Sequence, residues 1–288
     1  MSEMTANGGS GSGMEPEANG SPASARLCVL SVVVPVYNEA GNVIPLLDEI
    51  HAALDPAGLG YEVIFVDDAS DDATGQHLQK EAARGRVRLL RHQRRSGQSA
   101  AVRTGAQAAR GRWIATLDGD GQNNPADLPG LWQAVAAGDA ATPAELERNR
   151  PLFPPFAGPV LVSGVRRKRQ DDFSRRFASR LANSVRQALL RDDCPDSGCG
   201  IKLFRRDLFL DLPYFAAMHR FTPALFRMRG LPVAYVPVDH RPRREGRSKY
   251  GNLSRGLIGL VDLLGVYWLK RRTPADPGAA ENGAAFPV

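Results

Sequence analysis

The chain of 288 residues is 43% hydrophobic and 24% charged, which suits one large globular domain or two small ones with a real core. Its net charge is +6, but only 7% of its residues are aromatic and these do not interleave with the basic runs, which argues against a nucleic-acid-binding module. Three cysteines fit neither a disulfide framework nor a zinc site, and neither a signal peptide nor a bilayer-spanning run of roughly 20 apolar residues is visible, so we expect a cytoplasmic protein.

Residues 1–25 contain almost nothing apolar, and we expect a disordered tail there. Beyond it, aliphatic runs alternate with segments that repeat apolar residues at helical spacing. The runs predict strands over Leu27–Val34, Tyr61–Val66, Val87–Leu90 and Ile114–Leu117. The repeats predict helices over Ala40–Leu54, up to about Ala83, over Ser96–Ala109 and over Asp127–Ala137. This alternation predicts an α/β domain with a mostly parallel sheet and right-handed crossovers.

Paired acids follow two of these strands. Asp67 and Asp68 end the second, and Asp118 and Asp120 end the fourth. Parallel α/β sheets open their ligand crevice at the carboxyl ends of the strands, and oxygen ligands with a glycine between them suit a hard divalent cation that also holds phosphate. The plain alternatives are a solvated polar turn at Asp118 and Asp120, and a helix-capping turn at Asp67 and Asp68.

The second half of the chain is less regular. Residues 140–159 include five prolines and few periodic apolar residues, so we expect a loop insertion over one edge of the domain. An amphipathic helix with an arginine-rich outer face is predicted over Asp172–Arg191. The remaining predictions are strands over Val160–Val162 and Pro232–Val238, a turn and short strand over Cys194–Phe204, and helices over Asp207–Leu212 and Met218–Met228.

Basic residues gather in two places, with nine Lys or Arg in residues 163–191 and five in residues 239–249. Such clustering indicates an anionic partner, either a phosphate, a lipid headgroup or a nucleic acid. His240–Tyr250 is too rich in Gly, Pro and charge for regular structure, and we expect it to order over a bound substrate. Leu253–Leu269 is largely apolar and ends in Lys270, Arg271 and Arg272, which suits either a helix on a membrane surface or one packed on the core or a partner.

Six segments in this order, PVYNE, VDDASDD, LDGDGQNNP, SGVRRKR, DSGCGIKLFRR and REGRSKY, resemble the family 2 glycosyltransferases of the GT-A fold. Within that family they are similar to the polyprenyl-phosphate branch, to which dolichol-phosphate mannosyltransferase belongs. The resemblance covers about Leu30 to Tyr250. It implies a GT-A domain over residues 26–250. From the sequence pattern beyond it we expect an amphipathic, membrane-proximal helix over 251–272 and a disordered tail over 273–288.

The resemblance also implies roles for individual residues. The nucleotide-sugar site would contain Pro35, Tyr37, Glu39, Asp67, Asp68, Asp118 and Gln122. A Mg²⁺ or Mn²⁺ cofactor would be held by Asp118, Asp120 and Gln122. The catalytic positions would be Asp120 and Asp196. The acceptor phosphate would be bound by Arg166, Arg176, Arg244, Ser248 and Lys249.

Elementary chemistry supports these roles. A divalent ion neutralises the charge that builds on a departing nucleoside diphosphate. A phosphate monoester acceptor is already ionised at pH 7, so Asp196 is expected to position or stabilise charge ahead of acting as a general base. The alternative for Asp196 is a cap on the turn at Ser197 and Gly198.

We therefore expect a metal-dependent, inverting transfer of a sugar from a nucleotide sugar to a polyprenyl phosphate, with mannose as the leading sugar. The enzyme would lie on the cytoplasmic face of the inner membrane, against anionic lipid. Because no pair of membrane spans follows Tyr250, lipid contact would depend on the last helix or on a membrane partner subunit. The alternatives are a soluble or polysaccharide acceptor, and a non-catalytic module that binds phosphate or nucleic acid.

Overall fold

The structure is a computed structural model that describes residues 28–136, 156, 158–167, 184–242 and 252–273, with side chains from residue 259 onward in the last segment. Both predicted tails lie outside this part, apart from residue 273, as do most of the predicted 140–159 insertion and residues 172–183 of the predicted basic helix. Residues 243–250 of the loop predicted to order over substrate also lie outside it. Among the predicted site residues, those that fall outside are Arg176, Arg244, Ser248 and Lys249.

Within the described residues the strands form one seven-stranded sheet of order β3-β2-β1-β4-β6-β5-β7. The strands are β1 (Leu30–Val36), β2 (Tyr61–Asp67), β3 (Arg88–Arg91), β4 (Trp113–Thr116), β5 (Leu161–Arg166), β6 (Lys202–Arg205) and β7 (Val233–Val238). Neighbours pair in parallel except at β6, which is antiparallel to both β4 and β5. The sheet is thus mostly parallel, as the alternation of strands and helices predicts.

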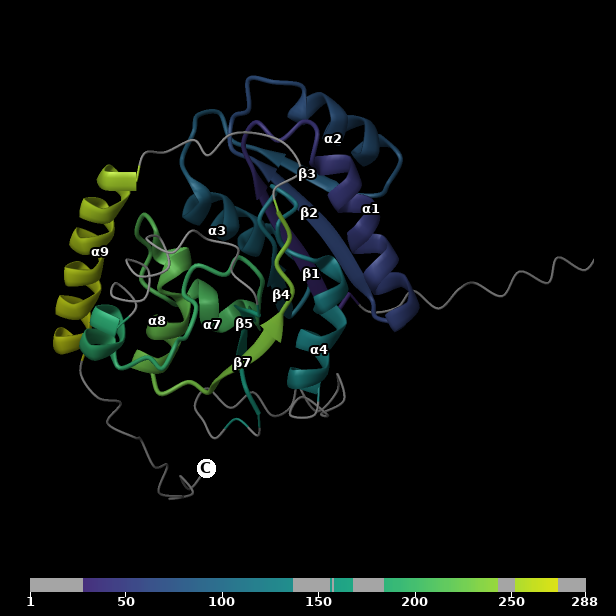
Figure 1. Cartoon of the computed structure of the whole chain (residues 1–288). Coiled ribbons are helices and arrows are strands. Elements are labelled where there is room, and N and C mark those ends of the chain that lie inside the picture. Colours follow the sequence, from purple (N-terminus) through teal and green to yellow (C-terminus); the bar gives the residue numbers. More distant parts are fainter. Residues whose placement is uncertain (1–27, 137–155, 157, 168–183, 243–251, 274–288) are drawn as a thin grey trace, which may run out of the picture.

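Helices cover both faces of the sheet (Figure 1). The helices are α1 (Val43–Leu54), α2 (Thr74–Ala83), α3 (Gln98–Ala108), α4 (Leu128–Ala136), α7 (Arg206–Leu210), α8 (Thr222–Met228) and α9 (Asn252–Arg272). Three short 3₁₀ turns are η1 (Asp55–Ala57), η2 (Pro125–Asp127) and η3 (Met218–Arg220).

Alternate residues of β1 point into two separate cores, because successive side chains of a strand face opposite sides of the sheet. Val32 and Val34 pack with apolar residues of α1, α2 and α4. Val33 packs in the other core with residues of α3, α7, α8 and α9. Burial on both faces explains why β1 reads as a continuous aliphatic run in the sequence.

One predicted helix is divided in the structure, so the prediction of a continuous helix is wrong. The apolar spacing predicts a single helix over Met218–Met228, whereas the structure has the 3₁₀ turn η3 and then the separate helix α8. Pro223 stands in the first turn of α8, where its missing N–H and fixed φ are tolerated, but inside a longer helix it would clash with the preceding turn.

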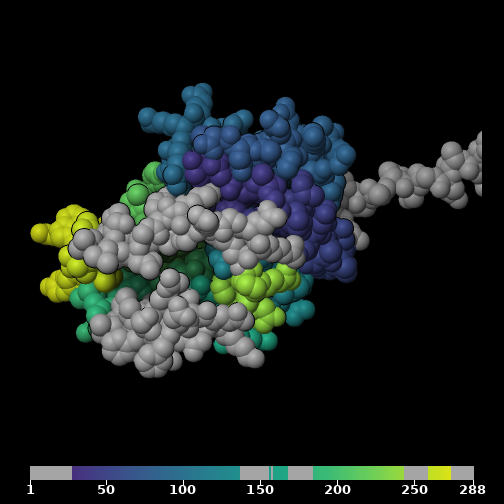
Figure 2. Space-filling view, turned by 45° about the horizontal axis from the view of Figure 1, so that its top comes forward, coloured from purple at the N-terminus to yellow at the C-terminus, as the bar shows by residue number. Residues whose placement is uncertain are grey.

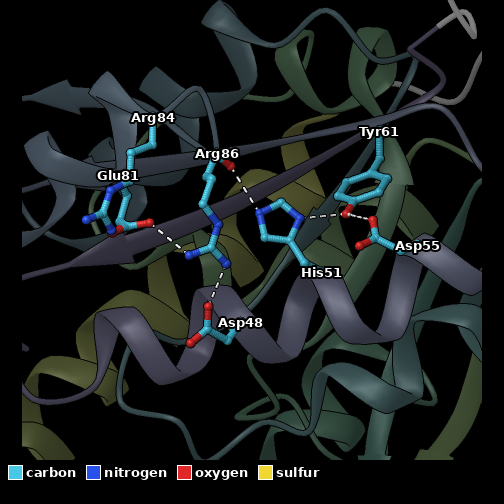
Figure 3. Close-up of polar contacts among 7 residues, drawn as sticks. All are labelled: Asp48, His51, Asp55, Tyr61, Glu81, Arg84 and Arg86. Atoms are coloured by element: carbon cyan, nitrogen blue, oxygen red, sulfur yellow. Dashed lines mark hydrogen bonds and ion pairs between the residues drawn. The ribbon is translucent and has the colours of Figure 1, made fainter. Parts of the chain in front are cut away.

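A polar network ties α1 to β2 and to the turn between α2 and β3 (Figure 3). The hydroxyl of Tyr61 donates to Asp55 at 2.5 Å and lies 2.6 Å from Nδ1 of His51, whose Nε2 is 3.1 Å from the carbonyl of Arg86. Arg86 in turn pairs with Asp48 at 2.5 Å and with Glu81 at 2.8 Å. Burial and the bond to Asp55 raise the pKa of Tyr61, so this hydroxyl stays a donor at neutral pH.

Candidate active site

A pocket of about 350 Å³ lies where β1 and β4 end and α3 begins. Its walls include residues that are far apart in sequence, among them Arg95, Gln98, His219 and Arg220. Six predicted site residues line it: Pro35, Tyr37, Glu39, Asp68, Asp118 and Asp120. The pocket therefore occupies the carboxyl edge of the parallel strands, where an α/β sheet opens its ligand crevice.

Asp118 and Asp120 lie on a tight loop after β4. The backbone N–H of Asp118 donates to Oδ1 of Asn123 at 2.8 Å, and that of Gln122 donates to Oδ1 of Asp120 at 3.1 Å. Gln98 donates from Nε2 to Oδ1 of Asp118 at 2.7 Å. Burial, and next the charge of Asp120, raise the pKa of Asp118.

The backbone at Gly200 forms a wall against the Asp118 carboxylate. A Cβ added at Gly200 would lie 2.1 Å from Oδ2 of Asp118, a contact that no side chain could make without displacing that oxygen. The hydroxyl of Thr116 on β4 donates to the carbonyl of Gly200 at 2.8 Å and holds the wall in place. A glycine is needed here for space.

Asp68 and Asp67 use their carboxylates to organise loops. Asp68 accepts hydrogen bonds from the backbone of Ser96 at 2.8 Å and of Gly97 at 2.7 Å, so it fixes the entry to α3. Asp67 is fully buried, accepts from the backbone of Ser70 at 2.9 Å and pairs with Arg91 at 3.3 Å. Asp68 thus faces the pocket, while Asp67 lies behind it.

Tyr37, Glu39 and Arg95 form another part of the pocket wall. The guanidinium of Arg95 lies over the Tyr37 ring, 4.2 Å from its centroid. The backbone N–H of Glu39 donates to Thr74 at 2.8 Å, and its carboxylate accepts from Asn42 at 2.6 Å. This wall offers an aromatic face and a cation side by side, the combination that stacks on bases and neutralises phosphate.

Arg166 and Asp196 form a two-pronged ion pair. Nε and Nη2 of Arg166 donate to the two carboxylate oxygens of Asp196 at 2.6 and 2.7 Å. Both side chains are largely buried, at the end of β5 and in the turn before β6. A Cβ added at Gly198 would lie 3.2 Å from Nη2 of Arg166, and Gly200 two residues on faces Asp118, so this pair lies near the Asp118 loop.

Gln98 and His219 line the pocket but lie outside the six segments that carry the resemblance, whereas Lys202 lies in one of those segments and not in the pocket wall. Nδ1 of His219 lies 2.8 Å from the hydroxyl of Ser99, and burial lowers the pKa of His219 to about 3, so its ring is neutral at pH 7. The ammonium of the buried Lys202 donates to the carbonyl of Cys199, and its charge acts on Asp118. No second histidine or acid lies at metal-binding spacing from His219 in the sequence. Gln98 is the first residue of α3, and it reaches Asp118 only because the fold brings the start of this helix to the pocket.

The donor chemistry of the Asp118 loop fits a divalent cation. Two carboxylates one residue apart repel each other in a largely buried setting, and a hard cation would relieve that repulsion. In the described part of the chain, no cluster of three or more His, Cys, Asp and Glu is placed for metal binding. A diphosphate and the Gln122 side chain would therefore have to complete the ligand set. The carbonyl of Gln122 accepts from the backbone of Arg241 at 3.0 Å.

The chain matches the model of glycosyl transferase family 2 over residues 31–212. It is 36% identical over 247 residues to a dodecaprenyl-phosphate galacturonate synthase of Rhizobium johnstonii, covering 84% of this chain and 67% of the relative. It is 32% identical over 237 residues to an undecaprenyl-phosphate 4-deoxy-4-formamido-L-arabinose transferase of Edwardsiella ictaluri, covering 82% and 65%. The chain thus spans about two thirds of the length of these relatives.

Among solved structures, the chain is similar to glucosyl-3-phosphoglycerate synthase from Mycobacterium tuberculosis. The complex with Mn²⁺, UDP-glucose and phosphoglyceric acid has a TM-score of 0.61 and 22% identity, covering 83% of this chain and 80% of that one. The complex with Mg²⁺ and UDP has a TM-score of 0.58 and 21% identity over the same shares. The predicted GT-A fold and the predicted resemblance to the polyprenyl-phosphate branch are confirmed.

Proposed function

Because this chain belongs to glycosyltransferase family 2, we propose that it transfers a sugar from a nucleotide sugar to a polyprenyl phosphate, with inversion and with a divalent cation. One observation carries the proposal: a single pocket joins the acids Asp118 and Asp120 with Tyr37 and Arg95, and the segment from Gly198 to Gly200 connects this pocket to the buried Arg166–Asp196 pair. Donor, cation and acceptor would meet at this pocket.

The donor occupies the pocket in this proposal. Pro35, Tyr37 and Glu39 contact the nucleoside, and Asp68 holds the loop that presents Arg95 to it. Asp67 supports the same edge from behind. Asp118, Asp120 and Gln122 hold Mg²⁺ or Mn²⁺ against the diphosphate. When bound, the cation neutralises the charge of the leaving group.

The acceptor phosphate approaches from the side of Arg166. We assign its binding to Arg166, Arg176, Arg244, Ser248 and Lys249. Both carboxylate oxygens of Asp196 accept hydrogen bonds from Arg166. In this proposal Asp196 therefore orients the guanidinium of Arg166 toward the phosphate. A dianionic phosphate needs no proton removed before attack, so a positioning role for Asp196 suffices.

The sugar is chosen by pocket details beyond these shared groups. Mannose stays a prediction, while the names of the relatives support a galacturonosyl or a 4-deoxy-4-formamido-L-arabinosyl group. Among the described residues, no helix has the length and hydropathy that crossing a bilayer requires. We propose peripheral attachment to the cytoplasmic face through α9, whose outer face carries exposed apolar side chains, with anionic lipid or a membrane partner subunit against it.

The proposal is tested by incubating the protein with Mn²⁺, a panel of nucleotide sugars that includes the three named above, and a short polyprenyl phosphate. We expect labelled sugar in the lipid extract with one donor. Transfer only to a soluble or polysaccharide acceptor would support an enzyme of that alternative specificity. No transfer with any donor would support a non-catalytic binding module.

Metal dependence follows from the same assignment. Replacing Asp118 or Asp120 by Asn should abolish nearly all transfer while far-UV circular dichroism stays unchanged, because both side chains lie on a pocket loop. EDTA should have the same effect and Mn²⁺ should restore activity. Full turnover in EDTA would contradict the metal assignment.

A further inference from the structure

The loop that carries the proposed metal ligands is held from outside by a distant part of the chain. We call residues 118–124 the metal loop and residues 239–241, which follow β7, the strap. The two run side by side through a β-bridge between Asn123 and His240. The backbone N–H of Arg241 donates to the carbonyl of Gln122 at 3.0 Å, and that of Asp239 donates to Oδ2 of Asp127 at 2.9 Å.

The side chain of Arg241 connects the strap to both the metal loop and α1. Its Nη1 donates to Oε2 of Glu49 on α1 at 2.6 Å, and its Nη2 donates to Oδ1 of Asn124 at the end of the metal loop. Arg241 therefore links three segments that are far apart in sequence: α1, the metal loop and the strap.

The metal loop depends on these contacts for its shape. Asn123, which the strap pairs with, is the residue whose side chain accepts from the backbone of Asp118. Gln122, whose carbonyl the strap fixes, donates its own N–H to Asp120. A movement of Asn123 or Gln122 would therefore shift both acids, since each is hydrogen-bonded to one of them.

The same helix offers an ordinary ion pair for comparison. Asp48 adjoins Glu49 on α1 and pairs with Arg86 at 2.5 Å, away from the pocket. Exposed pairs of this kind contribute little to stability. The side chains of Arg241 and Glu49 are still 34% and 28% exposed, so we expect their pair to add little to stability by itself. A large effect of its removal on metal binding would therefore reflect the position of the metal loop.

We propose that Arg241, oriented by Glu49, is a positioning residue that sets the geometry of Asp118 and Asp120 for the cation and the diphosphate. This inference rests on the proposed function, because it takes the acids as metal ligands. It adds a residue outside the pocket, and an anchor on α1, to the machinery that holds the cation.

The test uses the full chain and four variants: Arg241→Met, Arg241→Lys, Glu49→Gln and the control Asp48→Asn. Binding of Mn²⁺ is titrated in the presence of the nucleoside diphosphate that stabilises the wild type most. Because partners outside a metal's own ligands typically change affinity by about 10–100-fold, we expect Arg241→Met to weaken Mn²⁺ binding by at least about tenfold. Glu49→Gln and Arg241→Lys should weaken it less, and Asp48→Asn should not change it.

Hydrogen exchange of peptides that cover residues 118–124 provides a readout without ligand. Exchange should rise in Arg241→Met and Glu49→Gln and stay at the wild-type level in Asp48→Asn, although Glu49→Gln and Asp48→Asn each remove one ion pair of α1. If Arg241→Met fails to fold, Glu49→Gln decides the question alone.

Unchanged Mn²⁺ affinity together with unchanged exchange in Glu49→Gln and Arg241→Met would overturn the inference. Failure of the proposed function looks different: Asp118→Asn would then bind Mn²⁺ as the wild type does, whatever the exchange of the metal loop.

Discussion

Gly200 and Gly198 lie two residues apart and face different parts of the site. A Cβ at Gly200 would meet the Asp118 carboxylate at 2.1 Å, whereas one at Gly198 would meet the flexible Nη2 of Arg166 at 3.2 Å. We expect Gly200→Ala to lower kcat/KM by about a hundredfold or more, since displacing a reacting group by about 1 Å costs this much. Gly198→Ala should act mainly on the KM of the acceptor.

Steady-state kinetics of Gly200→Ala and Gly198→Ala, with donor and acceptor concentrations varied separately, test these two predictions. Thermal unfolding of both variants is the control for folding. Equal effects of the two substitutions on the donor and acceptor KM would contradict the assignment of Gly200 to Asp118 and of Gly198 to Arg166.

His219 predicts a pH dependence of stability. Its pKa is lowered from 6.5 to about 3 by burial, so below pH 6.5 the unfolded chain binds a proton that the folded chain does not. Stability therefore falls as the pH drops from 6.5 toward 3, by at most about 1.4 kcal/mol per pH unit. Urea unfolding at pH 7.5 and 5.0 should show a smaller acid loss for His219→Gln than for wild type, and equal losses would refute the prediction.

At the scale of elements, the network of Figure 3 predicts a change in stability without a change in catalysis. Tyr61→Phe removes one hydroxyl and its bonds to His51 and Asp55. Two hydrogen bonds of about 0.5–1.5 kcal/mol each give an expected loss of about 1–3 kcal/mol in the free energy of unfolding. Denaturant titration measures the loss, and kcat/KM should stay at the wild-type value because the network lies away from the pocket.

The strands and helices of the first half are readable from the sequence because their apolar periods are strong and local. β1, β2, α1 and α3 lie within a few residues of their predicted bounds. The insertion of β6 between β4 and β5 is a long-range pairing that no local pattern encodes. Pro223 lies in the first turn of α8, and the apolar spacing that continues across it predicts one helix where the structure has a 3₁₀ turn and a helix.

The candidate site divides in the same way. Asp118, Asp120 and Tyr37 follow strands directly, so strand prediction brings them to one edge. Gln98 and His219 reach the same pocket only through tertiary structure, and neither lies in a sequence motif. The pairing of Arg166 with Asp196 likewise joins two segments about 30 residues apart, which spacing alone could not reveal.

At the scale of the whole molecule, α9 forms a ridge at one side, yellow in Figure 2. Leu263 and Val266 pack into the core, while Val261 and Trp268 are 69% and 62% exposed and Leu260 and Leu264 are exposed beside them. Leu257 and Ile258, which belong to the predicted apolar segment Leu253–Leu269, have side chains outside the described part.

We expect this outer face to bind anionic bilayers. Burial of each apolar side chain contributes about 1.5–3 kcal/mol before ordering costs, and each basic residue near anionic lipid adds about 1 kcal/mol. Arg271 and Arg272 are exposed at the end of α9, so binding should weaken with salt.

Co-sedimentation with phosphatidylglycerol vesicles should lose most of the bound protein when Leu260, Val261, Leu264 and Trp268 are all replaced by Ser. Point replacements are preferable to truncation after Tyr250, because removal of Leu263 and Val266 would open the core. If the replaced protein pellets as wild type does, the face is covered by a partner subunit or another surface instead.

The reversed direction of β6 has a consequence for how this architecture can diversify. A strand antiparallel to its neighbours begins at the edge where they end, so the segment leading into β6 arrives beside Asp118 and brings Asp196 and Gly200 with it. A parallel β6 of four residues would have delivered that segment to the opposite edge, about 13 Å away. Asp196, the partner of Arg166, therefore enters the site on one short segment, and we expect an exchange of residues 194–199 between relatives to change the acceptor KM while the sheet register and Gly200 stay as they are.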